Sequence, residues 1–259
     1  MKASESNEQL LRLQEMMDYL GLPLMSQRAM DILYGTNKCK MDNKSFLEEI
    51  LSAEYDYKRN KILARDLRLG RLASRDGDYS LLYSHNGRLY SESSLEQVKS
   101  FYWIEKGINI SVFGKSNAGK SFFLVSVGQE ACSRGYRALY CDFSTIIDEL
   151  WYIKKADTAN YYKKLEHYVK IPILLIDDFL STALIESQEA ILFQLIKRRH
   201  ELKNPTIIAT QYDPSEWVTL MSQDTNLSGN ADAIRRRLVD DAYLVTIEAP
   251  GEDAIENTN

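Results

Sequence analysis

The stretch from Gly114 to Ser121 has the residue types and spacing of a phosphate-binding loop, because it reads G-x-x-x-x-G-K-S. Apolar runs before and after it predict a strand, a glycine-bounded loop and a helix. In such a loop, backbone N–H groups and the helix N-terminus surround phosphate oxygens, the lysine reaches the β- and γ-phosphates, and the hydroxyl ligates Mg²⁺. The alternative is a plain glycine turn before a lysine-bearing helix. We expect nucleotide contacts from Gly114, Lys115, Ser116, Asn117, Ala118, Gly119, Lys120, Ser121 and Phe122.

A second signal of nucleotide chemistry is the apolar run that begins at Ile171 and ends in Asp177 and Asp178. Such a run predicts a buried parallel strand, whose carboxylates emerge at the edge of the sheet where ligands bind. We expect Asp177 and Ser121 to hold Mg²⁺, and Asp178 to orient or deprotonate the attacking water. Acidic residues after strands are common, so this pair gains its weight from the phosphate-binding pattern upstream.

Two polar groups further along the chain could act on the γ-phosphate. Gln211 follows an apolar strand pattern, where a polar side chain either touches the γ-phosphate or its water, or simply ends the strand. Arg235, Arg236 and Arg237 close a predicted helix near 229–239. These arginines either favour the helix macrodipole or include an arginine finger that enters a neighbouring subunit's nucleotide site.

Composition bounds the class of protein. The 259 residues are 44% hydrophobic and carry a formal net charge of −5, which is typical of a soluble globular protein and argues against a uniformly basic nucleic-acid coat. No apolar run is long enough to cross a bilayer, and the N-terminus lacks the apolar core of a signal peptide. Cys39, Cys132 and Cys141 are too scattered for a disulfide framework or a zinc site. We expect a cytoplasmic protein with no membrane partner.

Residues 1–75 predict a small all-helical domain, with helices up to residue 20, over 25–34 and over about 43–69. The third helix ends in a basic run, in which positions 58, 61, 65 and 68 share one face. The run is either a solvated face supported by Glu49 and Glu54 or a stripe that contacts DNA phosphates, and we favour the stripe. Its residues are Lys58, Arg59, Lys61, Arg65, Arg68 and Arg71.

Residues 76–106 read as a polar linker and a lead-in helix that begins near Ser94. Within the linker, Leu81-Leu82-Tyr83 and Leu89-Tyr90 predict a short hairpin. From residue 107 onward, strand and helix patterns alternate, which predicts an α/β fold with a parallel sheet covered by helices on both faces. The expected strands span 107–113, 137–142, 171–177, 205–210 and 242–248, with helices between them near 120–134, 144–155, 158–169, 187–202 and 229–239.

With these pieces in order, the chain resembles the IstB family, the ATP-binding helper proteins of IS21-type transposons, over about residues 8–248. It is similar, more distantly, to DnaC/DnaI-type helicase loaders. Leu174–Phe179 looks like the family's Walker B segment, and Ile207–Gln211 followed by Ser215–Trp217 resembles its sensor-1 strand and the Glu-Trp after it. Ala233–Leu238 resembles the family's A-I-x-D-R-L, with Arg237 at the finger position.

The resemblance implies an AAA+ P-loop ATPase core with a five-stranded parallel sheet and no C-terminal lid. It implies ATP and Mg²⁺ as cofactors, and a homo-oligomer with nucleotide sites at subunit interfaces. It also implies assembly on duplex DNA with little sequence preference, remodelling of that DNA, and recruitment or stimulation of a partner transposase. The expected domains are a DNA-binding helical domain (1–75), a linker and lead-in helix (76–106), the ATPase domain (107–248) and a flexible tail (249–259).

Two other classes of protein share parts of this pattern. A DnaC-like replicative helicase loader has the same core, whereas the zinc module of DnaI-type loaders cannot be built from these unclustered cysteines. A stand-alone metabolic P-loop kinase would need a site for a second substrate, which the sequence does not offer. It would also leave the basic helical domain without a purpose.

Overall fold

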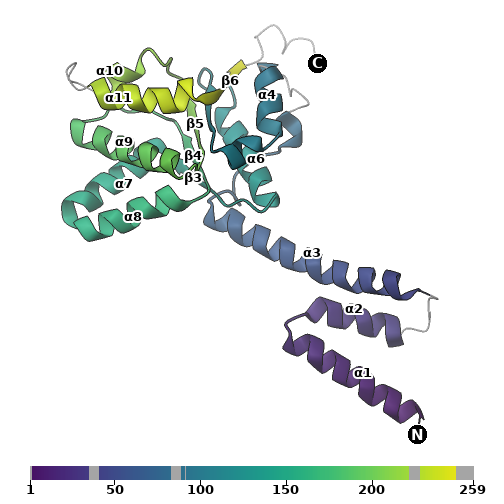
Figure 1. The fold of residues 1–259 in the computed structure, drawn as a ribbon. Helices are drawn as coiled ribbons and strands as arrows, with labels where there is room; N and C mark the ends of the chain where they lie inside the picture. The colour runs from purple at the N-terminus through teal and green to yellow at the C-terminus, as the bar shows by residue number, and fades with distance from the viewer. Residues whose placement is uncertain (1, 35–40, 83–88, 91, 222–227, 249–259) are drawn as a thin grey trace. The chain divides into compact units, whose positions relative to one another are not determined.

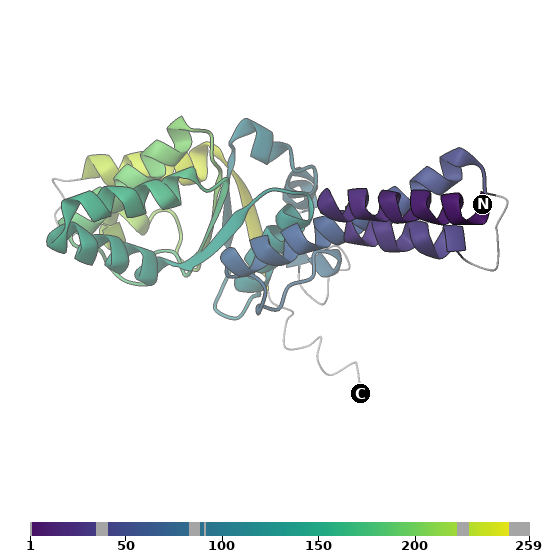
Figure 2. The ribbon, with the colours of Figure 1, turned by 90° about the horizontal axis from the view of Figure 1, so that it is seen from below.

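The computed structural model describes residues 2–34, 41–82, 89–90, 92–221 and 228–248, and the chain forms two compact units, Met1–Arg65 and Asp66–Asn259. The first unit contains α1 (Lys2–Tyr19), α2 (Pro23–Tyr34) and most of α3 (Asn43–Leu69). The helices α1 and α2 lie side by side in both views (Figures 1 and 2). These bounds confirm the helices predicted for the N-terminal part of the chain.

A buried carboxylate ties α3 to α2 within the first unit. Glu54 is 3% exposed, and its Oε2 accepts hydrogen bonds from the backbone N–H groups of Leu24 (2.9 Å) and Met25 (3.1 Å). These groups belong to the first turn of α2, where backbone donors lack helical partners. Glu49 also contacts α2, because its carboxylate accepts from Arg28 Nε at 2.9 Å. Both acids near the basic run therefore help to hold the helices together.

The second unit is built on a sheet with the strand order β1-β6-β2-β5-β4-β3. All neighbouring pairs from β6 to β3 are parallel, which confirms the predicted five-stranded parallel sheet. Because the strands are parallel, the carboxyl ends of β2, β4 and β5 meet at one edge of the sheet. The strands are β2 (Asn109–Phe113), β3 (Ala138–Asp142), β4 (Ile173–Asp177), β5 (Thr206–Thr210) and β6 (Ala242–Glu248).

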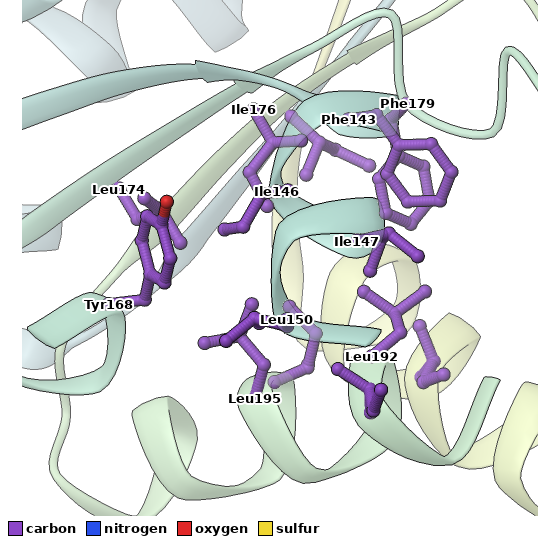
Figure 3. Packing of buried hydrophobic residues seen from close by; sticks show 14 of the residues in the cluster. Phe143, Ile146, Ile147, Leu150, Tyr168, Leu174, Ile176, Phe179, Leu192 and Leu195 are labelled. Atoms are coloured by element: carbon purple, nitrogen blue, oxygen red, sulfur yellow. The ribbon is translucent and has the colours of Figure 1, made fainter. Parts of the chain in front are cut away.

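Helices cover both faces of this sheet (Figure 1). On one face α6 (Lys120–Ser133) packs so closely that a Cβ on Gly128 would lie 2.4 Å from Leu175 Cδ1. The opposite face carries an apolar cluster in which Leu174 and Ile176 of β4 pack against three helices (Figure 3). This alternation along β4 is what a strand buried on both sides requires. The three helices are α7 (Phe143–Ala156), α8 (Thr158–Lys170) and α9 (Glu186–Glu201).

The linker before the sheet differs from the prediction. Leu89–Tyr90 forms β1, which pairs antiparallel with β6, and Ser80–Leu82 is a 3₁₀ turn, so the predicted hairpin between these two segments is wrong. The turn of that predicted hairpin, at 85–87, lies outside the described residues, and so does the predicted tail. The lead-in helix is confirmed as α4 (Glu92–Lys99). No helix in the described part of the chain is both long enough and apolar enough to cross a membrane.

The described part of the second unit also contains two short helices, and a third helix that continues into a π-helical turn. The helices α5 (Tyr102–Lys106) and α10 (Trp217–Met221) were not predicted, because five residues are too few to show a helical period. The helix α11 (Ser228–Arg235) continues directly into a π-helical turn, Arg236–Asp240. Such turns are rare and occur often at functional sites.

One buried arginine holds the amino ends of β4 and β5 together. Arg199, on α9, is 1% exposed, and its guanidinium donates to the carbonyl oxygens of Ile171 (2.9 Å) and Pro205 (2.6 Å) and to Thr206 Oγ1 (2.9 Å). No carboxylate partners this guanidinium among the described residues, and burial lowers its pKa. Its stabilising contribution is therefore the pairing of backbone carbonyls that water cannot reach.

We predict that Arg199→Met lowers the free energy of unfolding of the second unit by about 3 kcal/mol or more, since each orphaned buried acceptor costs about 1–3 kcal/mol. Urea unfolding followed by tryptophan fluorescence measures this unit, because Trp103, Trp151 and Trp217 all lie in it. Arg198→Met is the matched control. Its partly exposed ion pair with Glu166 should contribute less than about 1 kcal/mol. Equal losses for both variants would refute this role of Arg199.

Candidate nucleotide site

A cleft of about 470 Å³ lies at the carboxyl edge of the parallel sheet. It brings together side chains from three segments that are far apart in the sequence: the loop after β2, the turn after β4 and the end of β5. Most of the residues predicted to act on nucleotide therefore share one cavity. The lining residues are Ser116, Asn117, Gly119, Lys120, Ser121, Asp178 and Gln211.

The loop after β2 has the backbone that its sequence predicts. Asn117 (φ 62°) and Gly119 (φ 98°) are left-handed, and α6 begins at the next residue, so the helix N-terminus opens onto the cleft. A Cβ on Gly114 would lie 2.6 Å from the carbonyl oxygen of Ile247, so only glycine fits where the loop passes β6. Of the other loop residues, Lys115 is exposed, and the remaining two, Ala118 and Phe122, are buried and half-buried.

Lys120 is the cation of this cleft. It is 8% exposed, and its Nζ donates to the carbonyl oxygens of Gly114 (2.9 Å) and Lys115 (2.8 Å). Burial lowers the pKa of Lys120, while the nearby charges of Asp177 and Asp178 act to raise it. A cation that is removed from bulk water interacts more strongly with an anion that enters the cleft, because the local dielectric is low.

Asp177 ends β4 and is 3% exposed. Its Oδ2 accepts a hydrogen bond from the Tyr140 hydroxyl, and its Oδ1 accepts from the backbone N–H of Asp178 at 3.0 Å. Burial and the hydrogen bond to Asp177 raise the pKa of Tyr140, so the hydroxyl keeps its proton and donates it. The carboxylate is thus held in one orientation beside the cleft.

Asp178 lines the cleft and lies in a turn with an unusual backbone conformation. Both Asp178 (φ 49°) and Leu180 (φ 62°) are left-handed, a conformation that costs a non-glycine residue about 1–3 kcal/mol. Phe179 between them donates its N–H to the Ala209 carbonyl (2.7 Å) and accepts from Thr210 Oγ1 (2.9 Å), which fixes the turn against β5. Partial desolvation and the charge of Asp177 raise the pKa of Asp178.

The residues in and beside this cleft fit a nucleotide with its magnesium ion. Among the described residues no cluster of three or more acidic, histidine or cysteine side chains could hold a metal by itself. Mg²⁺ does not need one, because it usually binds one or two carboxylates together with substrate phosphates and water. Ser121 and Asp177 would hold the ion in that way. Left-handed loop backbone, a helix N-terminus and a buried lysine complete a site for phosphate oxygens.

The predicted arginines lie elsewhere. The carbonyl oxygen of Arg237 accepts a hydrogen bond from Asn109 Nδ2 at 2.8 Å, and Asn109 is the first residue of β2. The turn that contains Arg236 and Arg237 is therefore at the amino edge of the sheet, whereas the cleft is at the carboxyl edge.

The side chains of the basic residues of α3 are exposed, and they are divided between the two units. Lys58, Arg59, Lys61 and Arg65 belong to the first unit, and Arg68 belongs to the second. Arg71 follows the end of α3 and has a left-handed backbone (φ 58°), so it does not continue the helical face.

Sequence reasoning missed the side chains that surround Asp177. Tyr140 stands inside an apolar strand pattern, where it reads as a core residue, and it lies on the strand next to Asp177. The guanidinium carbon of Arg75 lies 3.7 Å from the centre of the Tyr140 ring. Nothing in the linear sequence links Tyr140 to Asp177, because their contact depends on the pairing of β3 with β4.

A parallel sheet with a phosphate-binding loop after β2 and paired aspartates at the carboxyl end of β4 defines a P-loop nucleotide-binding protein. A family model for IstB-like ATP-binding proteins matches residues 15–252, and the chain belongs to this family. The resemblance found in the sequence is confirmed.

Named relatives agree with this assignment. The chain is 26% identical to the ATP-binding protein of insertion sequence IS5376 from Geobacillus stearothermophilus, over 80% of each chain. It is 24% identical to that of IS232 from Bacillus thuringiensis subsp. berliner, over 89% of each chain.

Solved structures with a similar fold include a crystal structure of DnaI, with a TM-score of 0.53 and 19% identity, over 60% of this chain and 83% of that one. Another is AMPPCP-bound DnaA from Aquifex aeolicus, with a TM-score of 0.50 and 24% identity, over 61% of this chain and 46% of that one. These likenesses confirm the predicted α/β P-loop fold.

We predict that Lys120→Met weakens the binding of a fluorescent ATP analogue by about 10- to 150-fold, the equivalent of the roughly 1.5–3 kcal/mol of a hydrogen bond to a charged group. Equilibrium fluorescence titration measures this change. Lys115→Met removes an exposed side-chain cation from the same loop but keeps the backbone N–H that can contact phosphate, so it should bind nearly as tightly as the unchanged protein. If both variants weaken binding equally, the loop attracts nucleotide by its net charge and not through Lys120.

Proposed function

We propose that the protein is an ATP-hydrolysing, DNA-binding helper of IS21-type transposition, which assembles on duplex DNA, remodels it and recruits or stimulates a partner transposase. The observation that carries the proposal is the position of the arginine turn, at the edge of the sheet opposite the nucleotide cleft, in a chain of the IstB family. The relatives named above are proteins of insertion sequences, which supports a role in transposition.

Each residue in or beside the cleft has a separate role in ATP hydrolysis. Lys120 neutralises phosphate charge, and Ser121 and Asp177 hold Mg²⁺. When bound there, Mg²⁺ would supply positive charge that offsets the negative charge of the phosphates. Asp178 orients or deprotonates the attacking water, for which its raised pKa makes it a better proton acceptor than an ordinary aspartate. Gln211 lines the same cleft and can contact the γ-phosphate or its water.

The chain cannot complete this site with its own arginine turn. Asn109 Nδ2 donates to the Arg237 carbonyl (2.8 Å) and Ser111 Oγ donates to the Leu238 carbonyl, so the turn is bound to the amino half of β2. The phosphate-binding loop follows Phe113, at the other end of this five-residue strand. At about 3.3 Å per residue, the four residue steps from Asn109 to Phe113 span roughly 13 Å. An arginine from this turn can serve a nucleotide site only in a neighbouring subunit, which supports a homo-oligomer with nucleotide at its interfaces.

Ion pairing favours Arg237 as the finger among the three arginines. Arg235 pairs with Asp240 (2.9 Å), and Arg236 pairs with Asp232 (3.0 Å). Arg237 donates to the Ala233 carbonyl (2.7 Å), and its Nε is buried without a hydrogen-bond partner among the described residues. A guanidinium that no carboxylate neutralises is the one best able to stabilise a phosphate in the transition state.

The basic stripe on α3 supports contact with DNA. The solvated-face interpretation relies on support from Glu49 and Glu54, but Glu49 pairs with Arg28 of α2 instead. Glu54 does pair with Lys58, at 3.5 Å. Lys61 has no carboxylate partner in the described part of the chain and lies 5.9 Å from the Tyr57 ring centre. Exposed lysines and arginines at this spacing can displace counterions from a duplex, whatever its sequence.

We predict that the protein shifts long duplex DNA in a gel only with ATP and Mg²⁺, with little sequence preference. The double variant Lys61→Glu with Arg65→Glu should lose most of this binding. It should also reduce the slope of log affinity against log salt by about 1.8, at roughly 0.9 per lost phosphate contact.

The matched control reverses two exposed cations elsewhere in the same helical unit, Arg12→Glu with Lys44→Glu, and should bind as the unchanged protein does. Equal binding by both double variants would restore the solvated-face interpretation of the stripe. Binding to single strands alone, or to a replicative helicase, would favour a helicase loader over a transposition helper.

A further inference from the structure

Each carboxylate oxygen of Asp177 accepts one hydrogen bond from its own unit, which leaves lone pairs for a metal ion. The Tyr140 hydroxyl donates to Oδ2, and the backbone N–H of Asp178 donates to Oδ1 at 3.0 Å. The backbone bond comes from the adjacent residue and cannot be lost by a side-chain change. The orientation of the carboxylate therefore depends on one side chain, Tyr140.

Tyr140 is itself fixed from two sides. It is 2% exposed on β3, where it pairs with Leu175 of β4. The Arg75 guanidinium lies over its ring, 3.7 Å from the ring centre, and the Tyr140 N–H donates to the Gly70 carbonyl at 2.9 Å. A cation over a partly desolvated aromatic face is attracted by the electrons of the ring, which favours one ring position.

Gly70 and Arg75 belong to the segment 70–78, which directly follows α3 and is fastened to the nucleotide-binding core. A Cβ on Gly70 would lie 2.3 Å from the Ala138 carbonyl oxygen, so the segment touches the β3 backbone. Gln129 of α6 donates to the carbonyl oxygens of Leu72 (3.1 Å) and Arg75 (3.0 Å). The same helix that begins with Lys120 thus holds the segment whose arginine covers Tyr140.

We propose that Tyr140 is a positioning residue for the magnesium carboxylate Asp177, and that Arg75 holds the Tyr140 ring, so that the segment after α3 sets the orientation of that carboxylate. The inference rests on the proposed role of Asp177 as a magnesium ligand. Without the hydroxyl, Asp177 can rotate and pair with Lys120, which lies close enough for their charges to interact. Both groups would then be withdrawn from the nucleotide and its metal.

The test is the Mg²⁺ dependence of binding of a fluorescent ATP analogue. Tyr140→Phe keeps the ring beneath Arg75 and removes only the hydroxyl. We expect the Mg²⁺ concentration for half-maximal enhancement of binding to rise by about 10-fold or more, as for other groups that orient a metal ligand. Binding measured in excess chelator should stay within about twofold of the unchanged protein. Arg75→Met, at an exposed position, should shift the Mg²⁺ dependence in the same direction by a smaller factor.

Tyr168→Phe is the matched control. Tyr168 is 1% exposed in the same unit, and its hydroxyl also donates to a carboxylate, that of Glu149 on α7, away from the nucleotide cleft. It should leave the Mg²⁺ dependence unchanged. An unchanged dependence in Tyr140→Phe and Arg75→Met, or an equal shift in Tyr168→Phe, would overturn the proposal.

Asp177→Asn separates this inference from the proposed function. If that variant also keeps the Mg²⁺ dependence of the unchanged protein, Asp177 is not the magnesium ligand, and the proposed assignment of the site fails. If Asp177→Asn shifts the dependence and Tyr140→Phe does not, the ligand assignment stands and the positioning role of Tyr140 fails. Should Tyr140→Phe lose its folded tryptophan fluorescence, the exposed Arg75→Met variant decides the outcome.

Discussion

The hydrogen bonding of Asn109 and Ser111, in the amino half of β2, is the constraint on which the rest of the structure depends. The strand lies between β5 and β6 and leads at its carboxyl end into the phosphate-binding loop. At its amino end Asn109 binds both the Arg237 carbonyl and the Thr206 N–H, each at 2.8 Å, and Ser111 binds the Leu238 carbonyl. These bonds satisfy carbonyls of the π-helical turn and join it to the strand. Under the proposed function, β2 leads into the phosphate-binding loop of its own nucleotide site. The same strand holds the arginine turn that serves the nucleotide site of a neighbouring subunit.

The two edges of the sheet are built differently for this reason. At the amino edge, buried polar side chains such as Asn109 and Arg199 pair the ends of strands and turns, and the backbone is held tightly. At the carboxyl edge the chain accepts left-handed backbone at Asn117, Asp178 and Leu180. Strain of this kind persists only where the surroundings hold it, and here it turns polar side chains toward one cleft. The amino edge therefore contains the hydrogen bonds of buried polar side chains, and the carboxyl edge contains the residues of the nucleotide cleft.

The sequence predicts what local patterns encode. Apolar runs located all five parallel strands, and the spacing around Lys120 and Asp177 located the cleft, because each signal lies within a few adjacent residues. Contacts between distant residues could not be read in this way. Leu89–Tyr90 pairs with β6 and not with the nearby 80–82 segment, and the π-helical turn follows from hydrogen bonds to Asn109 and Ser111. The contact between Tyr140 and Asp177 likewise exists only once β3 lies beside β4.

Mixing two inactive variants tests most directly whether a neighbour completes the nucleotide site. Lys120→Ala lacks a working loop but keeps its arginine turn, and Arg237→Ala keeps the loop but lacks the finger. Measured with duplex DNA, ATP and Mg²⁺, each variant alone should hydrolyse ATP at a small fraction of the unmixed parent rate, whereas Arg236→Ala should remain active. An equimolar mixture of the two should recover substantial hydrolysis, because Lys120→Ala subunits supply Arg237 to intact loops next to them. A mixture as inactive as its components would contradict the shared site.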